Sequence, residues 1–264
     1  MSEEYTNIRV ERPEPGIAVV SFARPESMNA WTNDLIDELI DFINTMKSDY
    51  ETTVLIMRGD GEKGYCSGAD FNDLFPVQVM SDTVKSYDLQ NKLCDMLVAI
   101  RKLPQVIINL AFGHTIGGGF FLAMAADIRI IADNVKFSVP LLKLGLGCAD
   151  LGSSYYLMRQ IGSGVAKDIL FTGRPLMAEE AMRLGFASEC VPFDQLDEAG
   201  LAKARLIAQS DPLAVRLSKE ALNFAQDSQS FEETLAFENR NQQMIQAYSI
   251  AKMMRAKKAE QSSN

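Results

Sequence analysis

The sequence predicts an α/β fold with a helical region at its C-terminal end. Short apolar segments typical of strands alternate with segments of helical periodicity in the first part of the chain, and from Ser153 onward the pattern is mostly helical. Two glycine-rich segments each follow a predicted strand. We therefore expect residues 1–194 to form the core and residues 195–264 to form a helical oligomerisation region.

The N-terminal part predicts a β-hairpin followed by a helix and a third strand. Residues 5–11 and 17–22 are strand-like, and Glu14-Pro15-Gly16 between them is typical of a turn. Residues 34–49 place apolar side chains at helical spacing, and residues 53–58 form a short apolar run. The members of the helical stripe are Leu35, Leu39, Ile43 and Met46.

A similar alternation follows. We expect a helix at residues 83–102, a strand at 105–109, a helix that begins with glycine at 118–126, and strands at 128–132 and 136–138. The order of elements repeats, although the sequence itself does not. The helical tail carries more apolar side chains than solitary surface helices expose, which favours burial against the core or against another subunit.

Composition and charge argue against several classes of protein. The 264 residues carry a formal net charge of -9, which opposes attraction to a phosphate backbone, so we expect no nucleic-acid partner. The apolar runs are shorter than the roughly 20 residues that span a bilayer, and the acidic N-terminus does not resemble a secretory signal. We expect a cytoplasmic protein with no membrane partner. The four cysteines are scattered without a CxxC pair, so neither a disulfide framework nor a metal site is predicted.

The two glycine segments are the candidates for a functional site. Residues 64–71 (GYCSGADF) and residues 113–121 (GHTIGGGFF) each lie between a predicted strand and a predicted helix, where backbone amides are free for a ligand. Glycine also allows close approach of a ligand, and tight packing of helix against strand is the alternative explanation. Neither segment has the pattern of a P-loop or a dinucleotide-binding fingerprint. The only histidine, His114, lies within the second segment, and no nucleophile elbow occurs, which disfavours a Ser-His-Asp hydrolase.

A series of motifs runs along the chain in a characteristic order. They are Arg24-Pro25, Asn29-Ala30, Cys66-Ser67-Gly68-Ala69-Asp70, Gly117-Gly118-Gly119, Ala126-Asp127-Ile128-Arg129-Ile130, Phe171-Thr172-Gly173-Arg174 and Ala178-Glu179-Glu180-Ala181. In these motifs and in its helical tail the chain resembles the crotonase (enoyl-CoA hydratase/isomerase) superfamily over nearly its whole length. The resemblance implies a crotonase-like spiral of strand-strand-helix units with a C-terminal helical region, assembled as a homotrimer or hexamer.

The resemblance also implies an acyl-coenzyme A (acyl-CoA) thioester as substrate, with coenzyme A part of the substrate and no separate cofactor. The backbone amides of Ala69 and Gly118 would form an oxyanion hole, in which each donor is worth about 3–4 kcal/mol in comparable sites. Arg24 is a candidate for the phosphates of coenzyme A, or simply a solvated surface charge. The residues expected to bind coenzyme A or the acyl group are Arg24, Cys66, Ser67, Gly68, Asp70, Phe71, Gly117, Phe121 and Leu141.

The sequence departs from the family pattern at two positions. Hydratases of the family use two glutamates to hold and activate water, and the matching positions here are Phe121 and Leu141, which cannot exchange protons. Asp150 is the candidate replacement, because its apolar and glycine neighbours would desolvate the carboxylate and raise its pKa. Alternatively, Asp150 caps the helix that follows. Further candidates for the pocket are Tyr87, Asp88, Ser154 and Tyr155.

These features favour an acyl-CoA lyase or isomerase that acts through an enolate. A carbon–carbon bond hydrolase acting on a cyclic or diketone acyl-CoA is an alternative within the same superfamily. A non-catalytic acyl-CoA-binding or RNA-binding relative is a third possibility, which the loss of both glutamates favours and the net charge opposes.

Overall fold

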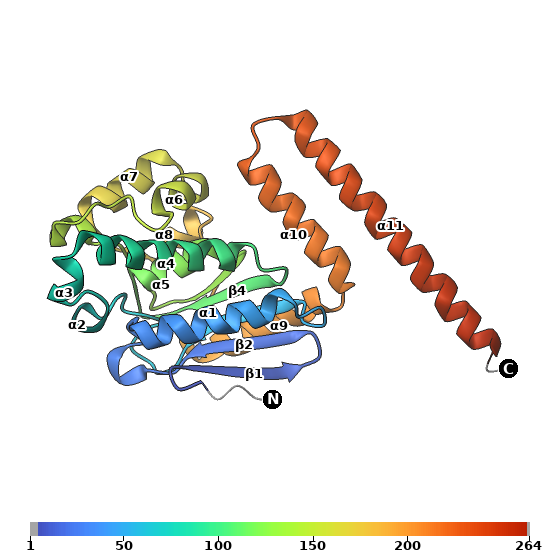
Figure 1. Cartoon of the computed structure of the whole chain (residues 1–264), viewed down its shortest axis with the longest axis horizontal. Coiled ribbons are helices and arrows are strands. Elements are labelled where there is room, and N and C mark those ends of the chain that lie inside the picture. Colours follow the sequence, from blue (N-terminus) through green and yellow to red (C-terminus); the bar gives the residue numbers. More distant parts are fainter. Residues whose placement is uncertain (1–4, 263–264) are drawn as a thin grey trace.

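The structure is a computed structural model that describes residues 5–262, and it has the α/β architecture that the sequence predicts (Figure 1). A six-stranded sheet has the order β1-β2-β3-β4-β6-β9, and a three-stranded sheet has the order β5-β7-β8. The acidic start of the chain falls partly on residues 1–4, outside the described range. The strands are β1 Ile8–Glu14, β2 Ile17–Phe22, β3 Val54–Gly59, β4 Val106–Ala111, β5 His114–Ile116, β6 Ile128–Ala132, β7 Lys136–Ser138, β8 Leu176–Met177 and β9 Glu189–Val191.

The helices lie between the strands in the first part of the chain and follow one another at its end. The α-helices are α1 Asn33–Lys47, α2 Phe71–Leu74, α3 Val77–Met80, α4 Thr83–Arg101, α5 Gly118–Ala125, α6 Ser153–Ile161, α7 Ser163–Thr172, α8 Ala178–Arg183, α9 Leu196–Ala208, α10 Pro212–Asp227 and α11 Phe231–Ser262. Short 3₁₀ helices are η1 Pro25–Ser27, η2 Leu141–Leu144 and η3 Phe193–Gln195.

The central strands of the larger sheet are apolar along most of their length. β2, β3 and β4 pair in parallel, and nearly all of their residues are buried. Parallel strands have this composition because other layers cover both faces of the sheet. α9 packs on β2, β3, β4 and β6, α5 packs on β4, and α4 packs on both α1 and α5. This packing holds the end of β4 and the start of α5 in place.

Helix α1 agrees closely with its sequence pattern. The Thr32 hydroxyl accepts a hydrogen bond from the Leu35 amide at 3.3 Å and so caps the first turn. All four residues of the predicted apolar stripe are buried. The helix ends at Lys47, two residues earlier than predicted, because the Ser48 amide donates to the carbonyl oxygens of Thr45 and Met46 and closes the last turn.

Strand β1 is displaced from its predicted position at residues 5–11. Ile8 pairs with Phe22 and Glu14 with Ile17, so pairing continues up to the turn at Pro15-Gly16. The strand contains Pro13, which the sequence pattern treats as a strand breaker. An edge strand tolerates proline because one side of its backbone has no partner strand.

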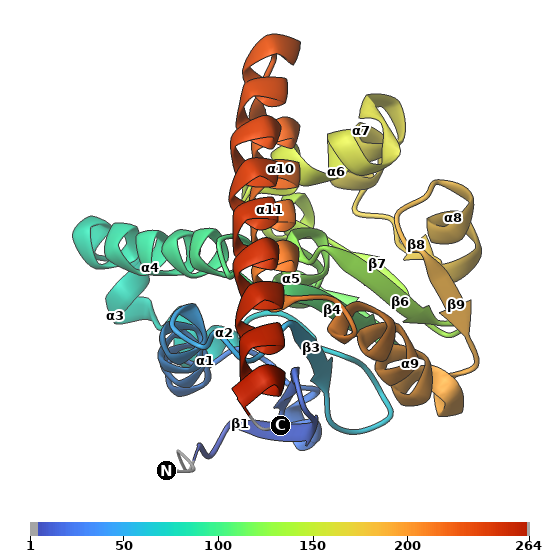
Figure 2. The same ribbon diagram turned by 90° about the vertical axis from the view of Figure 1, so that its right-hand side faces the viewer.

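The boundary between core and tail differs from the predicted one at residue 195. Helix α9, which begins the predicted tail, packs on the sheet and buries Leu196, Gly200 and Ala204. The core therefore extends to Ala208. α10 and α11 form a helical hairpin that projects from this body (Figures 1 and 2).

No helix within residues 5–262 combines the length and apolar character needed to cross a membrane. Over the same residues, no cluster of His, Cys, Asp and Glu side chains is suited to hold a metal ion.

Candidate functional site

The two glycine segments lie side by side. The Cys66 amide donates to the His114 carbonyl oxygen at 3.2 Å, and the Ile116 amide donates to the Cys66 carbonyl oxygen at 2.8 Å. The His114 side chain is exposed, and its backbone is what joins the segments. Two segments about 50 residues apart in the chain are thus joined by the hydrogen-bond pattern of a parallel β-bridge.

Both segments turn sharply where they meet. Gly68 has a φ of +95° and Gly117 a φ of +50°, backbone conformations that residues other than glycine rarely adopt. The turns are in close contact, because a Cβ atom built on Gly68 would lie 3.7 Å from the Gly118 nitrogen. The structure therefore brings Ala69, the next residue after Gly68, to the start of α5, where Gly118 lies.

In the second segment, the amides on either side of Gly118 are engaged. The Gly117 amide donates to the Ser138 carbonyl oxygen at 2.9 Å, and the Gly119 amide donates to the Cys66 sulfur. Gly118 is the first residue of α5, where an amide has no acceptor within the helix. Within residues 5–262, the Gly118 amide donates to no protein group.

The first segment shows the same pattern around Ala69. The Gly68 amide lies 3.4 Å from the Cys66 sulfur, and the Asp70 amide donates to the Trp31 carbonyl oxygen at 2.9 Å. The Ala69 amide, between these two, likewise donates to no group of the described chain. The geometry thus leaves one free amide in each segment, at the two positions that the sequence predicts.

Trp31 contacts both segments. Its amide donates to the Gly68 carbonyl oxygen at 2.7 Å, and its indole ring packs beneath α5. A Cβ atom built on Gly118 would lie 2.6 Å from a ring atom, so any side chain there would displace the ring. Gly118 is therefore required for the packing of α5 against Trp31. The same residue also carries one of the two free amides.

Cys66 packs between the two segments, and its predicted contact with coenzyme A stays a prediction. Its side chain is fully buried, and its backbone amide and carbonyl are both used in bonds to the second segment. Burial raises the pKa of the thiol to about 12, so the sulfur stays protonated. Cys66 holds the segments together, because its sulfur accepts the amides of Gly68 and Gly119.

Three polar candidates for coenzyme A binding, Ser67, Asp70 and Arg24, already form hydrogen bonds within the protein. The Ser67 hydroxyl donates to the Ser27 carbonyl oxygen at 3.2 Å, and Asp70 accepts the Asn72 amide at 3.2 Å as the cap of α2. Arg24 is half-buried and donates to the Ala30 carbonyl oxygen at 2.6 Å. Each of these side chains already has a protein partner, so a role toward coenzyme A stays a prediction.

The apolar candidates differ in how much surface they offer. Phe71 is 50% exposed and packs against Phe75, with ring centroids 5.6 Å apart. Leu141 begins η2 and is half-buried, whereas Phe121 is only 3% exposed and belongs to the core. Its neighbour Phe120 is completely buried against Phe137. Phe71 and Leu141 are therefore the candidates with surface for an acyl chain.

Asp150 lies in the loop before α6 and does not cap that helix with its side chain. The N-cap residue is Gly152, and the Asp150 carboxylate oxygen Oδ1 instead accepts the Leu151 amide at 2.9 Å. The same oxygen accepts Gln90 Nε2 at 2.6 Å. Burial raises the pKa of Asp150, and these two hydrogen bonds oppose the rise. The desolvated carboxylate that the sequence predicts is present, and capping by its side chain is not.

Two of the remaining candidates, Tyr155 and Asp88, contact other parts of the protein. Tyr155 bonds to Arg101 and Asp227, at the end of α10. Asp88 lines a groove of about 430 Å³ between α1 and α4, away from the glycine segments. Gln90, which holds Asp150, was missed by sequence reasoning, because nothing local marks this residue of α4 as a partner of a loop 60 positions later.

Comparison with known proteins identifies the family of the chain. Residues 12–261 match the profile of the enoyl-CoA hydratase/isomerase family. The chain is 35% identical over 241 residues to the Mycobacterium tuberculosis protein named "Probable enoyl-CoA hydratase EchA12", covering 90% of this chain and 84% of the relative.

Two solved structures have the same fold. An enoyl-CoA hydratase from Bacillus anthracis superposes with a TM-score of 0.84 at 28% identity, covering 90% of each chain. A monofunctional enoyl-CoA isomerase from M. smegmatis superposes with a TM-score of 0.73 at 32% identity, covering 87% of this chain and 98% of that one. With a crotonase fold and a family match over nearly its whole length, this chain belongs to the enoyl-CoA hydratase/isomerase family.

Proposed function

We propose that the chain is an acyl-CoA isomerase or lyase that acts through an enolate, with the amides of Ala69 and Gly118 as the oxyanion hole and Asp150 as the group that moves protons. The observation that carries this proposal is the pair of free amides in adjacent segments. Two fixed N–H donors favour the charge that develops on a thioester oxygen as the enolate forms. Membership of the family supports an acyl-CoA substrate.

The position of Asp150 supports its role in proton transfer. Asp150 precedes α6, and Gln90 of α4 donates a hydrogen bond to it. Both α6 and α4 pack against α5, the helix that begins at Gly118. A carboxylate with a raised pKa is suited to take and return a proton near neutral pH. Phe121 and Leu141 offer no ionisable group, so one carboxylate has to suffice.

A double-bond shift is the reaction that best fits one carboxylate. Asp150 takes a proton from C2 of a 3-enoyl thioester, the C2–H bond breaks, and its electron pair delocalises toward the thioester oxygen as a dienolate. The amides of Ala69 and Gly118 stabilise that oxygen. The Asp150 carboxyl then delivers its proton to C4, which forms the 2-enoyl thioester and regenerates the carboxylate.

The test is the conversion of 3-hexenoyl-CoA to 2-hexenoyl-CoA in D₂O, followed by chromatography and mass spectrometry. Asp150→Asn should reduce isomerisation and deuterium exchange by about 10²-fold or more, because a single acid/base group contributes on that scale. Binding of the thioester, measured by calorimetry, should stay nearly unchanged.

Asp88→Asn is the matched control, since Asp88 is an exposed carboxylate in the groove between α1 and α4 and should not affect turnover. A folded Asp150→Asn variant with full activity would limit Asp150 to a structural role. A complex with acetoacetyl-CoA whose thioester oxygen lies away from Ala69 and Gly118 would refute the oxyanion hole.

A further inference from the structure

The contact between Gln90 and Asp150 joins two elements that are distant in sequence. Gln90 lies in α4, and its Nε2 donates to Asp150 Oδ1 at 2.6 Å, the short distance expected for a hydrogen bond to an ionised acceptor. The Leu151 amide donates to the same oxygen at 2.9 Å. Both bonds reach Oδ1, so Oδ2 is the oxygen left to face a substrate.

The backbone around Asp150 is fixed by bonds within its own loop. The Ser153 amide donates to the Asp150 carbonyl oxygen at 2.8 Å, and the Ser153 hydroxyl donates to the Cys148 carbonyl oxygen at 2.9 Å. Leu151 has a φ of 43°, in the left-handed region that a β-carbon disfavours. These contacts set the path of the chain, but they leave the carboxylate free to rotate about its side-chain bonds. Of the two groups bonded to Oδ1, Gln90 is the one from outside the loop.

We propose that Gln90 is a positioning residue that fixes the orientation of the Asp150 carboxylate and keeps it ionised for proton abstraction. The proposal rests on the proposed function, in which Asp150 exchanges protons with the substrate. Gln90 itself has no acid/base chemistry, so its contribution is to hold Oδ1 and thereby direct Oδ2.

The electrostatic surroundings give the proposal a measurable consequence. Burial raises the pKa of Asp150, whereas the hydrogen bond from Gln90 lowers it because the N–H donor stabilises the ionised form. The titratable group that faces Asp150 from α4 is Cys94, whose own pKa is raised by burial and by the charges of Asp150 and Asp95. Cys148 lies on the same loop as Asp150. Removing the Gln90 donor should therefore raise the pKa of Asp150 further.

The experiment compares pH profiles of kcat/KM for isomerisation of 3-hexenoyl-CoA. Gln90→Met keeps the length and helix propensity of the side chain but removes the donor, so the acid limb should move up by about one pH unit and kcat should fall about tenfold. Gln90→Glu places a second carboxyl against Asp150, and the acid limb should move at least as far in the same direction. KM should change little in both variants.

Two controls separate this effect from a structural one. Asn91→Met removes an exposed amide from the neighbouring position of α4, which faces the groove with α1, and should leave the pH profile in place. Cys94→Ala removes the facing thiol and should leave the Gln90 effect intact. Circular dichroism establishes that each variant is folded.

The outcomes distinguish this inference from the proposed function. If Asp150→Asn is inactive and both Gln90 variants keep the original acid limb, the positioning role is wrong while the proposed function stands. If Asp150→Asn retains isomerisation, both are wrong. A matching upward shift in Gln90→Met and Gln90→Glu, absent in Asn91→Met, supports the role of Gln90.

Discussion

Trp31 and Cys66 hold the two free amides in position through their contacts with both segments. The ring of Trp31 lies against Gly118 while its backbone bonds to Gly68, and the sulfur of Cys66 accepts amides from both segments. Both side chains are buried, so their contacts are shielded from water. The separation of the amides of Ala69 and Gly118 is thus determined by packing as much as by hydrogen bonding.

The apolar residues at Phe121 and Leu141 lead to a prediction about hydration. The protein should be a poor hydratase of crotonyl-CoA, because water has to be held, deprotonated and added while a proton reaches the neighbouring carbon. Each acid/base contribution is typically worth about 10²–10⁴-fold in rate. Binding of crotonyl-CoA should persist, since the amides do not depend on those side chains.

The measurement is the loss of enoyl absorbance at saturating crotonyl-CoA. A two-glutamate hydratase of the same family, run in parallel, is the control. Turnover equal to that of the control would show that Phe121 and Leu141 do not prevent efficient hydration.

Two ion pairs, at Lys219 and Asp227, connect helix α10 to the body. Lys219 is only 6% exposed, and its Nζ lies 2.7 Å from Asp127 and 2.7 Å from the Gln105 carbonyl oxygen. Burial lowers the pKa of Lys219, and the charge of Asp127 opposes that change. At the other end of the helix, Asp227 forms an ion pair with Arg101 of α4 at 2.8 Å. The helical hairpin is therefore anchored to the helix that carries Gln90.

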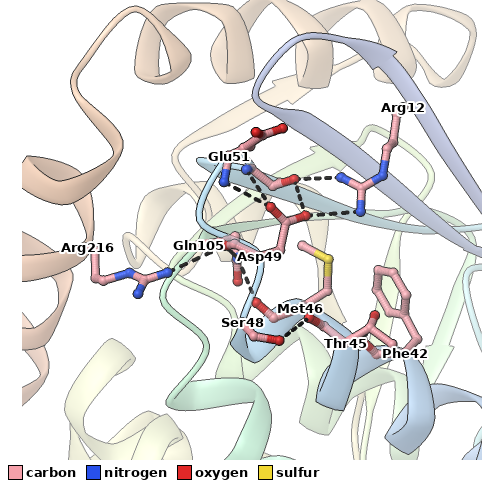
Figure 3. A network of polar contacts seen from close by, with 10 residues as sticks. Arg12, Phe42, Thr45, Met46, Ser48, Asp49, Glu51, Gln105 and Arg216 are labelled. Carbon is pink, nitrogen blue, oxygen red and sulfur yellow. Dashed lines mark hydrogen bonds and ion pairs between the residues drawn. The ribbon is translucent and has the colours of Figure 1, made fainter.

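Asp49, in the loop after α1, connects this loop to β1 and to α10 (Figure 3). Asp49 forms an ion pair with Arg12 of β1 at 3.0 Å and accepts the Thr52 hydroxyl at 2.7 Å. Its carbonyl oxygen accepts bonds from Gln105 at 3.0 Å and from Arg216 of α10 at 3.4 Å. Burial raises the pKa of Asp49, but the bonds from Thr52 and Glu51 and the charge of Arg12 outweigh it, and the net pKa is lowered.

Asp49→Ala should lower the free energy of unfolding by about 1–3 kcal/mol at neutral pH, since hydrogen bonds to a charged group are lost. The folded pKa of Asp49 lies below its ordinary value of 3.8. Its stabilising contribution is therefore fully present above that value and is lost as pH falls through the folded pKa. The difference between wild type and variant should shrink in acid.

Urea unfolding at neutral pH and near pH 3 measures this difference. Glu51→Ala, at an exposed neighbouring position, keeps the backbone amide that bonds to Asp49 and should change stability little. A difference between Asp49→Ala and wild type that stays constant in acid would contradict the assignment.

On the scale of the whole molecule, the hairpin of α10 and α11 exposes an unusual amount of apolar surface. Lone exposed apolar residues are ordinary, but a group of them on one projecting element indicates contact with another surface. They are Leu222, Phe231, Leu235, Met244, Tyr248, Ile250, Met253 and Met254, each at least 41% exposed.

We therefore expect a trimer or hexamer in solution, because closed symmetric assembly is the usual way to bury such surfaces. Light scattering after size-exclusion chromatography should show it at micromolar concentration. The double variant Ile250→Glu and Met254→Glu, which places charges on one face of α11, should dissociate the assembly. Asn91→Glu adds charge at an exposed position of α4 and should not. A stable wild-type monomer would contradict the prediction.

The sequence by itself determined the local features. The spacing of apolar residues was enough to locate α1, because one helical face repeats with a local period. The glycine segments could be identified because sharp turns at Gly68 and Gly117 require glycine. The free amides of Ala69 and Gly118 agree with the prediction because a helix start and a turn expose amides wherever they occur.

Only the tertiary structure decided which distant residues meet. Cys66 is buried rather than exposed to a ligand because the second segment covers it, and α9 joins the core because the sheet offers a face for it. Gln90 reaches Asp150 across 60 positions of the chain. Periodicity and turn chemistry act over a few residues, whereas these contacts depend on how whole elements pack, so the sequence pattern carries no local signal for them.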